Sequence, residues 1–110
     1  MTKVRRGDLV TVAVSGDYGK PRPALIIQAD AFDSFSSVTV APLTSEIYQA
    51  PLFRVTIQPG KETGLHRISQ VMVDKITTVP RSKIGQRIGF VEASTLRAVN
   101  QAIKGFLDVE

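Results

Sequence analysis

The hydrophobic pattern of this 110-residue chain changes its period once, and that change constrains the fold more than any other feature. Over the first 80 residues, short runs rich in Val, Ile and Thr alternate with clusters of turn formers, as is typical of β-strands. After Phe90 the apolar residues recur with the period of a helix. The predicted strands are Asp8–Val14, Pro23–Gln28, Ser37–Leu43, Leu52–Gln58 and Gln70–Val79, and the helical stripe is Leu96, Val99, Ile103, Phe106 and Leu107.

Five short strands followed by one amphipathic helix predict a mainly β fold, in which a strongly curved antiparallel sheet is covered by a C-terminal helix. The helix is expected to begin after Glu92 or Ser94, either of which can serve as its cap. The chain has no internal repeat, no low-complexity tract and no linker, and its length suits one hydrophobic core. We therefore expect a single domain over residues 1–110.

The composition excludes several kinds of chemistry. The chain has no cysteine and one histidine, His66, so it offers neither a thiolate nor a Cys- or His-cluster metal site. We therefore expect no metal and no cofactor. The longest apolar stretch is only a few residues, around Ala24–Ile27, and no apolar segment follows the basic residues near the N-terminus. This pattern predicts neither a membrane span nor a signal peptide, and it favours a cytoplasmic protein.

The net charge of +4 is distributed unevenly along the chain. Residues 1–22 carry five basic and two acidic groups, and residues 61–87 carry six basic and two acidic groups, whereas the remaining segments are net acidic. If the two basic segments meet in space, they form a cationic surface suited to nucleic acid or to an acidic protein segment. The alternative is an ordinary solvated surface with a modest surplus of Lys and Arg.

Three groups of polar residues lie where a strand could hold them rigidly. Arg22 stands between two prolines that fix the backbone at the start of a buried strand, although an ordinary surface arginine fits the same pattern. Thr44 and Ser45 end an alternating strand, where hydroxyls donate to phosphate oxygens or simply cap a turn. Asp74 interrupts an apolar run and is a proton acceptor, a partner for Arg22 or an exposed residue.

His66 is a weaker candidate, because an imidazole mechanism of the two-histidine kind cannot operate with one histidine. Its Gly64-Leu65-His66-Arg67 context indicates a solvent-facing loop before a strand. We therefore expect no catalytic role for His66.

Several sequence blocks, taken in order, resemble those of one protein family. These blocks are Arg6-Gly7-Asp8-Leu9-Val10, Lys20-Pro21-Arg22-Pro23-Ala24-Leu25-Ile26-Ile27, Val38-Thr39-Val40-Ala41-Pro42-Leu43-Thr44-Ser45, Thr63-Gly64-Leu65, Ser69-Gln70-Val71-Met72-Val73-Asp74 and Arg81-Ser82-Lys83-Ile84-Gly85. Over roughly residues 5–107 the chain is similar to the MazF/PemK (Kid) toxins of type II toxin–antitoxin systems. The resemblance implies an SH3-like barrel of the CcdB/PemK type, a homodimer, and an endoribonuclease that cleaves single-stranded messenger RNA without metal. It also implies a cognate antitoxin whose acidic, flexible segment occupies the RNA groove.

The resemblance also implies site residues. Arg22 and Thr44 match the family's functional arginine and threonine, and Asp74 matches a general base of some members. In this reaction the ribose 2′-hydroxyl attacks the neighbouring phosphorus, which gives a 2′,3′-cyclic phosphate and a 5′-hydroxyl end. A fixed guanidinium and a hydroxyl donor stabilise the extra charge of the transition state. The residues expected to contact the RNA are Tyr18, Lys20, Ser45, Tyr48, Lys75 and Arg81, of which the two tyrosines can stack on unpaired bases.

The chain departs from its relatives at Met72, where some have an arginine, at Lys75, where they tend to have glutamine, and in a shorter first loop, Gly16–Gly19. An acid–base scheme borrowed from those relatives is therefore less secure than the Arg22 and Thr44 pair. Two other functions remain open. A gyrase poison of the CcdB type shares the fold, but it uses a tryptophan-containing tail and this chain has no tryptophan. A basic barrel that binds RNA without cleaving it is the other.

Overall fold

The computed structural model describes residues 3–13 and 20–110, which form seven strands, one α-helix and three single-turn 3-10 helices. The strands are β1 (Asp8–Ala13), β2 (Pro21–Ile26), β3 (Ser37–Thr44), β4 (Arg54–Ile57), β5 (Ser69–Met72), β6 (Thr77–Pro80) and β7 (Ile84–Phe90). The α-helix is α1 (Ala93–Leu107), and the 3-10 turns are η1 (Asp30–Phe32), η2 (Val73–Lys75) and η3 (Arg81–Lys83).

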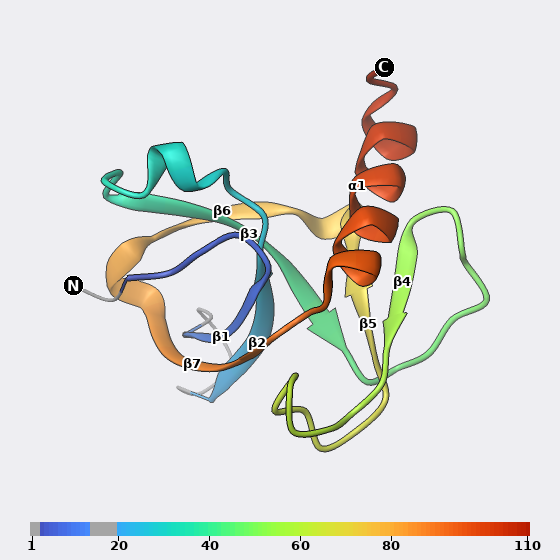
Figure 1. The fold of residues 1–110 in the computed structure, drawn as a ribbon, viewed down its shortest axis with the longest axis horizontal. Coiled ribbons are helices and arrows are strands. Elements are labelled where there is room, and N and C mark those ends of the chain that lie inside the picture. Colours follow the sequence, from blue (N-terminus) through green and yellow to red (C-terminus); the bar gives the residue numbers. More distant parts are fainter. Residues whose placement is uncertain (1–2, 14–19) are drawn as a thin grey trace.

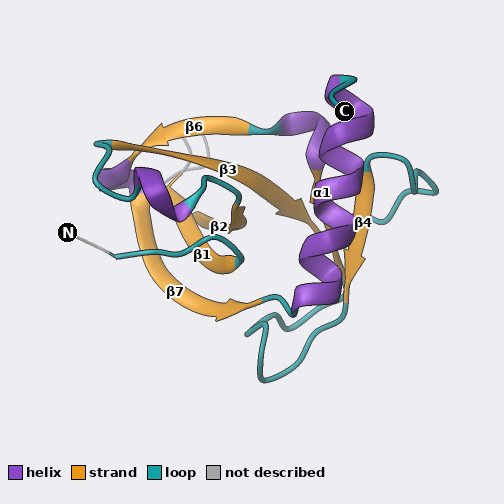
Figure 2. Ribbon diagram, turned by 45° about the horizontal axis from the view of Figure 1, so that its top comes forward, coloured by secondary structure: helices purple, strands orange, loops and turns teal. Residues whose placement is uncertain are grey.

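The strands form one antiparallel sheet in the order β4-β5-β3-β2-β1-β7, with β6 pairing to the first half of β3. The sheet curls strongly around itself, and α1 packs across its outer side near β4 and β5 (Figures 1 and 2). The pairing of the described strands does not close the sheet, because β4 and β7 each have one neighbour. The predicted class, a curved antiparallel β fold with a C-terminal helix, is confirmed.

Two differences from the predicted strands have physical causes. The run predicted as one strand over Gln70–Val79 is broken by η2, so that β5 pairs with the end of β3 and β6 with its beginning. The prediction missed β7, whose glycines dilute the apolar pattern. A Cβ at Gly85 would lie 2.3 Å from Thr11 Oγ1, and one at Gly89 would lie 2.3 Å from the Glu62 carbonyl oxygen. Glycine at these positions permits close approach of neighbouring chain segments.

Successive residues of the central strands are buried on both faces of the sheet. Leu9 and Leu25 belong to a core between the sheet and α1, whereas Val10 and Ile26 belong to a second core inside the curve. Burial on both faces explains why these strands carry near-continuous apolar runs.

The helix begins after Glu92, one of the two predicted caps, and Val99 and Ala102 are its buried residues. The predicted apolar stripe enters the core only in part, since Phe106 and Leu107 are 49% and 55% exposed. The last turn of α1 extends beyond the edge of the sheet, whereas the earlier turns pack against the sheet (Figure 1). Among the described residues, no helix has the length and apolarity that crossing a membrane requires.

Candidate functional site

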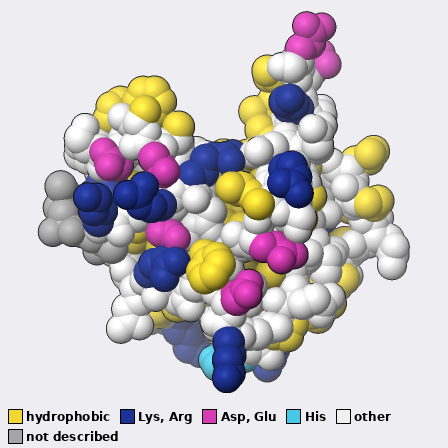
Figure 3. All heavy atoms as spheres, in the orientation of Figure 1, with side chains coloured by type: hydrophobic (Ala, Val, Ile, Leu, Met, Phe, Trp, Pro, Cys, Tyr) yellow, Lys and Arg dark blue, Asp and Glu magenta, His cyan; other side chains and the backbone are white. Residues whose placement is uncertain are grey.

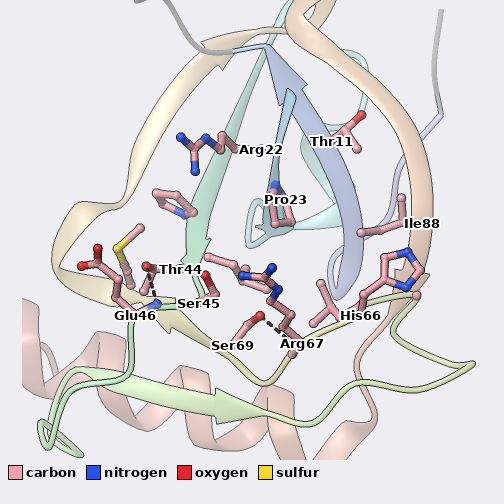
Figure 4. Close-up of a pocket in the computed structure, with 15 residues that line it drawn as sticks. Thr11, Arg22, Pro23, Thr44, Ser45, Glu46, His66, Arg67, Ser69 and Ile88 are labelled. Atoms are coloured by element: carbon pink, nitrogen blue, oxygen red, sulfur yellow. Dashed lines mark hydrogen bonds between the residues drawn. The ribbon is translucent and has the colours of Figure 1, made fainter. Parts of the chain in front are cut away.

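A surface cavity of about 720 Å³ lies where the β2 start, the β3 end, the loop before β5 and β7 come together (Figure 4). Arg22 and Thr44, predicted from separate motifs, both line it, as does Ser45. The other lining residues are Thr11, Pro23, Pro42, Leu43, Glu46, Gly64, Leu65, His66, Arg67, Ser69, Met72 and Ile88.

Strand pairing fixes the backbone that carries Arg22. In the β1–β2 register, Arg22 lies opposite Val12, and the flanking prolines lie opposite Thr11 and Ala13. The proline rings hold their own φ angles, so the exposed Arg22 side chain extends from a stiff segment. In Figure 4 its guanidinium lies on the same side of the cavity as Thr44 and Glu46, away from His66.

Thr44 is the last residue of β3 and pairs with Gln70 of β5. Its half-buried hydroxyl oxygen accepts the backbone N–H of Glu46 at 3.1 Å, which fixes the side chain beside the cavity. A hydroxyl that accepts one hydrogen bond still carries its own proton. Thr44 can therefore donate that proton to an acceptor in the cavity.

The opposite side of the cavity is formed by the loop before β5, which presents the exposed His66 and Arg67 (Figure 4). Gly64 shapes this loop with φ +70°, and a Cβ there would lie 2.0 Å from the Ile88 carbonyl oxygen. Sequence reasoning placed His66 in a solvent-facing loop and did not single out Arg67. The signal that could have found Arg67 is the charge of residues 61–87, because the two basic segments meet here through Arg22 and Arg67.

Asp74, a predicted catalytic residue, is not among the residues that line the cavity. Its carboxylate accepts two hydrogen bonds from Arg54, from Nε at 2.9 Å and from Nη2 at 3.2 Å. The exposed Lys75 ammonium lies 3.8 Å from its second oxygen. The hydrogen bonds from Arg54, above all, hold the pKa of Asp74 below its ordinary value of 3.8, against the opposing effect of burial.

The remaining predicted RNA contacts fall in different environments. Lys20 and Lys75 are exposed, and Tyr48 is 53% exposed in the loop after β3. Arg81 is 6% exposed, and its Nε and Nη2 donate to the carbonyl oxygens of Phe35 and Asp33, each at 2.8 Å. Arg81 therefore anchors the loop around η1, and its contact with RNA stays a prediction. Tyr18 lies outside the described residues.

In the part of the chain that the structure describes, no group of three or more His, Cys, Asp or Glu side chains is arranged to hold a metal ion. The charged groups of the cavity are instead Arg22, Arg67 and Glu46, with His66 beside them. Figure 3 shows Lys and Arg side chains gathered near the histidine at the lower edge of the molecule. The arrangement suits a polyanion.

Together, the open curved sheet, its C-terminal helix and the cavity with two arginines at the strand ends define a small β-domain whose cavity is suited to a polyanion. The chain belongs to the family of PemK-like, MazF-like toxins of type II toxin–antitoxin systems, whose model matches residues 5–107. This finding confirms the family that the sequence blocks indicated.

Individual relatives agree with this assignment. A probable endoribonuclease MazF of Mycolicibacterium smegmatis is 47% identical over 107 residues, which cover 96% of this chain and 98% of the relative. Endoribonuclease MazF6 of Mycobacterium tuberculosis is 32% identical over 82% of this chain and 81% of its own length. Among solved structures, the Mycobacterium tuberculosis toxin MazF-mt6 superposes with a TM-score of 0.81 at 27% identity, covering 94% of this chain and 98% of that one. A mycobacterial endoribonuclease in complex with its cognate antitoxin shares the fold, with a TM-score of 0.82, 22% identity and 97% of both chains covered.

Proposed function

We propose that this toxin is an endoribonuclease that cleaves single-stranded RNA in the cavity between Arg22 and Arg67. The observation that carries the proposal is that Arg22 and Thr44, which come from different strands, line the same cavity. Relatives named as MazF endoribonucleases, at 47% and 32% identity, support the activity. The cationic lining supports a polyanionic substrate.

In the proposed reaction the 2′-oxygen attacks phosphorus, the bond to the 5′-oxygen breaks, and a cyclic phosphate and a 5′-hydroxyl end result. The phosphorane-like transition state gathers negative charge on its equatorial oxygens. Arg22 supplies a permanent cation against that charge, and Thr44 donates a hydrogen bond beside it. Both donors are held before substrate binds, by the prolines around Arg22 and by the Glu46 N–H on Thr44.

One proton must leave the 2′-hydroxyl and one must reach the leaving 5′-oxygen. Asp74 is poorly suited to accept the first, because Arg54 holds its carboxylate and lowers its pKa. The described ionisable groups that line the cavity, apart from the two arginines, are Glu46 and His66. We assign proton transfer to these two, which revises the sequence-based expectation of no catalytic role for His66, and we assign a structural role to Asp74.

Other residues are proposed to bind the RNA strand on either side of the scissile bond. Arg67, Lys20 and Ser45 are exposed and offer donors to phosphate oxygens, and Lys75 adds a further exposed cation. Tyr48 exposes its ring to stack on an unpaired base. Messenger RNA is the proposed substrate, because it offers long single-stranded stretches, and its cleavage would stop translation and growth.

The biological unit is proposed to be a cytoplasmic homodimer that a cognate antitoxin neutralises. An acidic, flexible antitoxin segment fits the same cationic cavity as RNA, so the two would compete for it. The family description supports an antitoxin partner. Light scattering on the purified chain tests the dimer, which is expected at twice the 12.0 kDa mass of one chain.

The direct test is incubation of the purified protein with a long single-stranded RNA in excess EDTA, with the cut ends mapped by primer extension. Discrete cuts with 5′-hydroxyl ends are expected from the wild type and should be lost in Arg22→Ala. The control is Arg97→Ala, which removes an exposed arginine of α1 that does not line the cavity and should cut normally. Intact RNA after incubation with folded wild type would overturn the proposal and direct attention to a protein target such as gyrase.

A further inference from the structure

The most unusual charged group outside the cavity is Arg54, the first residue of β4, which is only 8% exposed. A guanidinium is costly to bury unless its charge and its N–H groups are matched. Asp74 matches the charge and takes the Nε and Nη2 protons, at 2.9 and 3.2 Å. The third nitrogen, Nη1, is buried without a hydrogen-bond partner among the described residues.

Aromatic rings provide the rest of the environment of this guanidinium. Its central carbon lies 5.1 Å from the centroid of the Tyr48 ring and 5.8 Å from that of Phe53. Both distances are in the range at which a cation is attracted to the face of an aromatic ring. The Tyr48 ring therefore packs against the guanidinium of the Arg54–Asp74 ion pair.

Tyr48 is fixed from its other sides as well. The Gln70 side chain, 3% exposed, accepts the Tyr48 N–H at 3.1 Å and donates to the Tyr48 carbonyl oxygen at 3.0 Å. The phenolic hydroxyl donates to Glu46, a cavity-lining residue, at 3.1 Å. Despite these contacts the side chain stays 53% exposed, so it is an ordered aromatic surface open to solvent.

We propose that Arg54 is a positioning residue for RNA recognition, which together with Asp74 holds Tyr48 as a stacking platform for an unpaired base beside the cavity. The inference deepens the proposed function and rests on it. Base stacking on an aromatic side chain contributes roughly five- to 150-fold in affinity. Because the ring is ordered before RNA binds, less of that gain is lost to immobilising the side chain. The role of Asp74 in this scheme is to hold Arg54.

The composition of the chain permits a direct readout. It has no tryptophan and only two tyrosines, so Tyr18→Phe leaves Tyr48 as the single tyrosine. The probe is a mixed-sequence, 2′-O-methylated single-stranded RNA 12-mer, which cannot be cleaved because its nucleophile is blocked. We expect this RNA to quench Tyr48 emission. In the same Tyr18→Phe background, the substitutions Arg54→Met and Asp74→Asn remove both charges of the ion pair. They should raise the RNA concentration that gives half of the maximal quenching by about three- to ten-fold.

A double-mutant comparison separates positioning from a direct RNA contact. Binding of the same RNA, labelled and followed by anisotropy, should weaken strongly in Tyr48→Ala and hardly further when the Arg54 and Asp74 substitutions are added. The control is Ile47→Ala, a neighbouring exposed residue, which should bind RNA as the wild type does. The proposal would be overturned if the affinity losses of Tyr48→Ala and of the Arg54→Met, Asp74→Asn variant multiplied when the substitutions were combined. Unchanged RNA binding in the Arg54→Met, Asp74→Asn variant would also overturn it, as would RNA binding without quenching of Tyr48.

Circular dichroism melting checks that each variant is folded. If the paired variant does not fold, Arg54→Lys, which keeps the charge but not the two-point contact, replaces it in both measurements with the same expected direction. With cleavable RNA, the paired variant should raise KM by a larger factor than it lowers kcat, because Tyr48 also contacts Glu46, and a lower kcat with an unchanged KM would contradict the positioning role. A wild type that is quenched by RNA but never cuts it would contradict the endoribonuclease and leave the platform standing.

Discussion

At the scale of single residues, the cavity combines two donors that are immobilised by different means. Arg22 relies on the prolines next to it, and Thr44 relies on a hydrogen bond from the Glu46 backbone. Neither arrangement depends on a bound substrate, so both donors can meet a developing charge without reorganising. Substitutions that keep the shape of a side chain and remove only its donor are therefore the most informative.

Thr44→Val keeps the branched shape and removes the hydroxyl, and with it both the donor to the substrate and the acceptor of the Glu46 N–H. We expect kcat for RNA cleavage to fall by roughly 10²-fold, with a much smaller change in RNA affinity, since the donor acts on charge that develops in the transition state. Single-turnover cleavage of a mapped site measures this. Ser45→Ala, next along the chain and proposed to contact a phosphate, serves as the comparison, and it should weaken RNA binding while it retains most of kcat. Equal losses in the two variants would argue against a specific role for Thr44.

Asp74→Asn tests the structural role of that carboxylate through pH. Because the pKa of Asp74 is lowered in the folded chain, its charge stabilises the fold above the ordinary pKa of 3.8, and this contribution is lost as the pH falls through the lowered value. The difference in Tm between wild type and Asp74→Asn should be largest at pH 5 and above and should shrink below about pH 3.8. Melting curves from pH 7 to pH 2 measure it, with Asp33→Asn, an exposed residue, as control. A difference that does not vary with pH would contradict the role assigned to the Arg54 contact.

The residues of the cavity were predictable from the sequence to different degrees. Arg22 and Thr44 stand in motifs whose flanking residues reveal them. Arg67 is an ordinary loop residue whose place at the cavity depends on the turn at Gly64 against β7. Arg81 and Asp74 were predicted as site residues from their charge, which does not show that Asp33, Phe35 and Arg54 are their hydrogen-bond partners in the fold. Such long-range pairings, which join residues 20 or more positions apart, are invisible to a local pattern.

At the scale of elements, patterns of period two and 3.6 were enough to predict most strands and the helix. They failed where one segment serves two partners, as in the break at η2, and where glycine replaces an apolar residue to admit a neighbouring segment, as in β7. The same close approach positions the loop that carries His66 and Arg67. The position of this loop against β7 therefore determines the shape of one side of the cavity.

Gly64→Ala tests this junction. Its positive φ and the 2.0 Å separation between an added Cβ and the Ile88 carbonyl oxygen should destabilise the fold by about 1–3 kcal/mol, which lowers Tm by roughly 5–15 °C. Gly60→Ala in the same loop is the matched control, because a Cβ there meets nothing within 4 Å and should change stability by less than about 0.5 kcal/mol. Thermal unfolding of both variants measures the difference. Equal melting temperatures would show that the loop is not held against β7.

At the scale of the whole molecule, folding brings together charges that lie far apart in the chain. The first basic segment contributes Arg22 and the second contributes Arg67, and the net charge of +4 draws a polyanion toward the face they share. An RNA strand and an acidic antitoxin segment would each displace counterions here. The two ligands would therefore compete without a conformational change, because the phosphates of RNA and the carboxylates of the antitoxin segment would contact the same cations.

Salt dependence measures how many of these contacts RNA makes. The logarithm of the affinity for a single-stranded 2′-O-methylated RNA should fall linearly with the logarithm of salt concentration, with a slope of about −0.7 for each phosphate contact. Arg67→Ala should reduce the magnitude of that slope by about 0.7, because it removes one cation from the cavity. Arg97→Ala, which removes an exposed cation of α1 outside the cavity, should leave the slope unchanged. If both variants shifted the slope equally, the RNA would be responding to net charge and not to the cavity, and the strand would not pass Arg67.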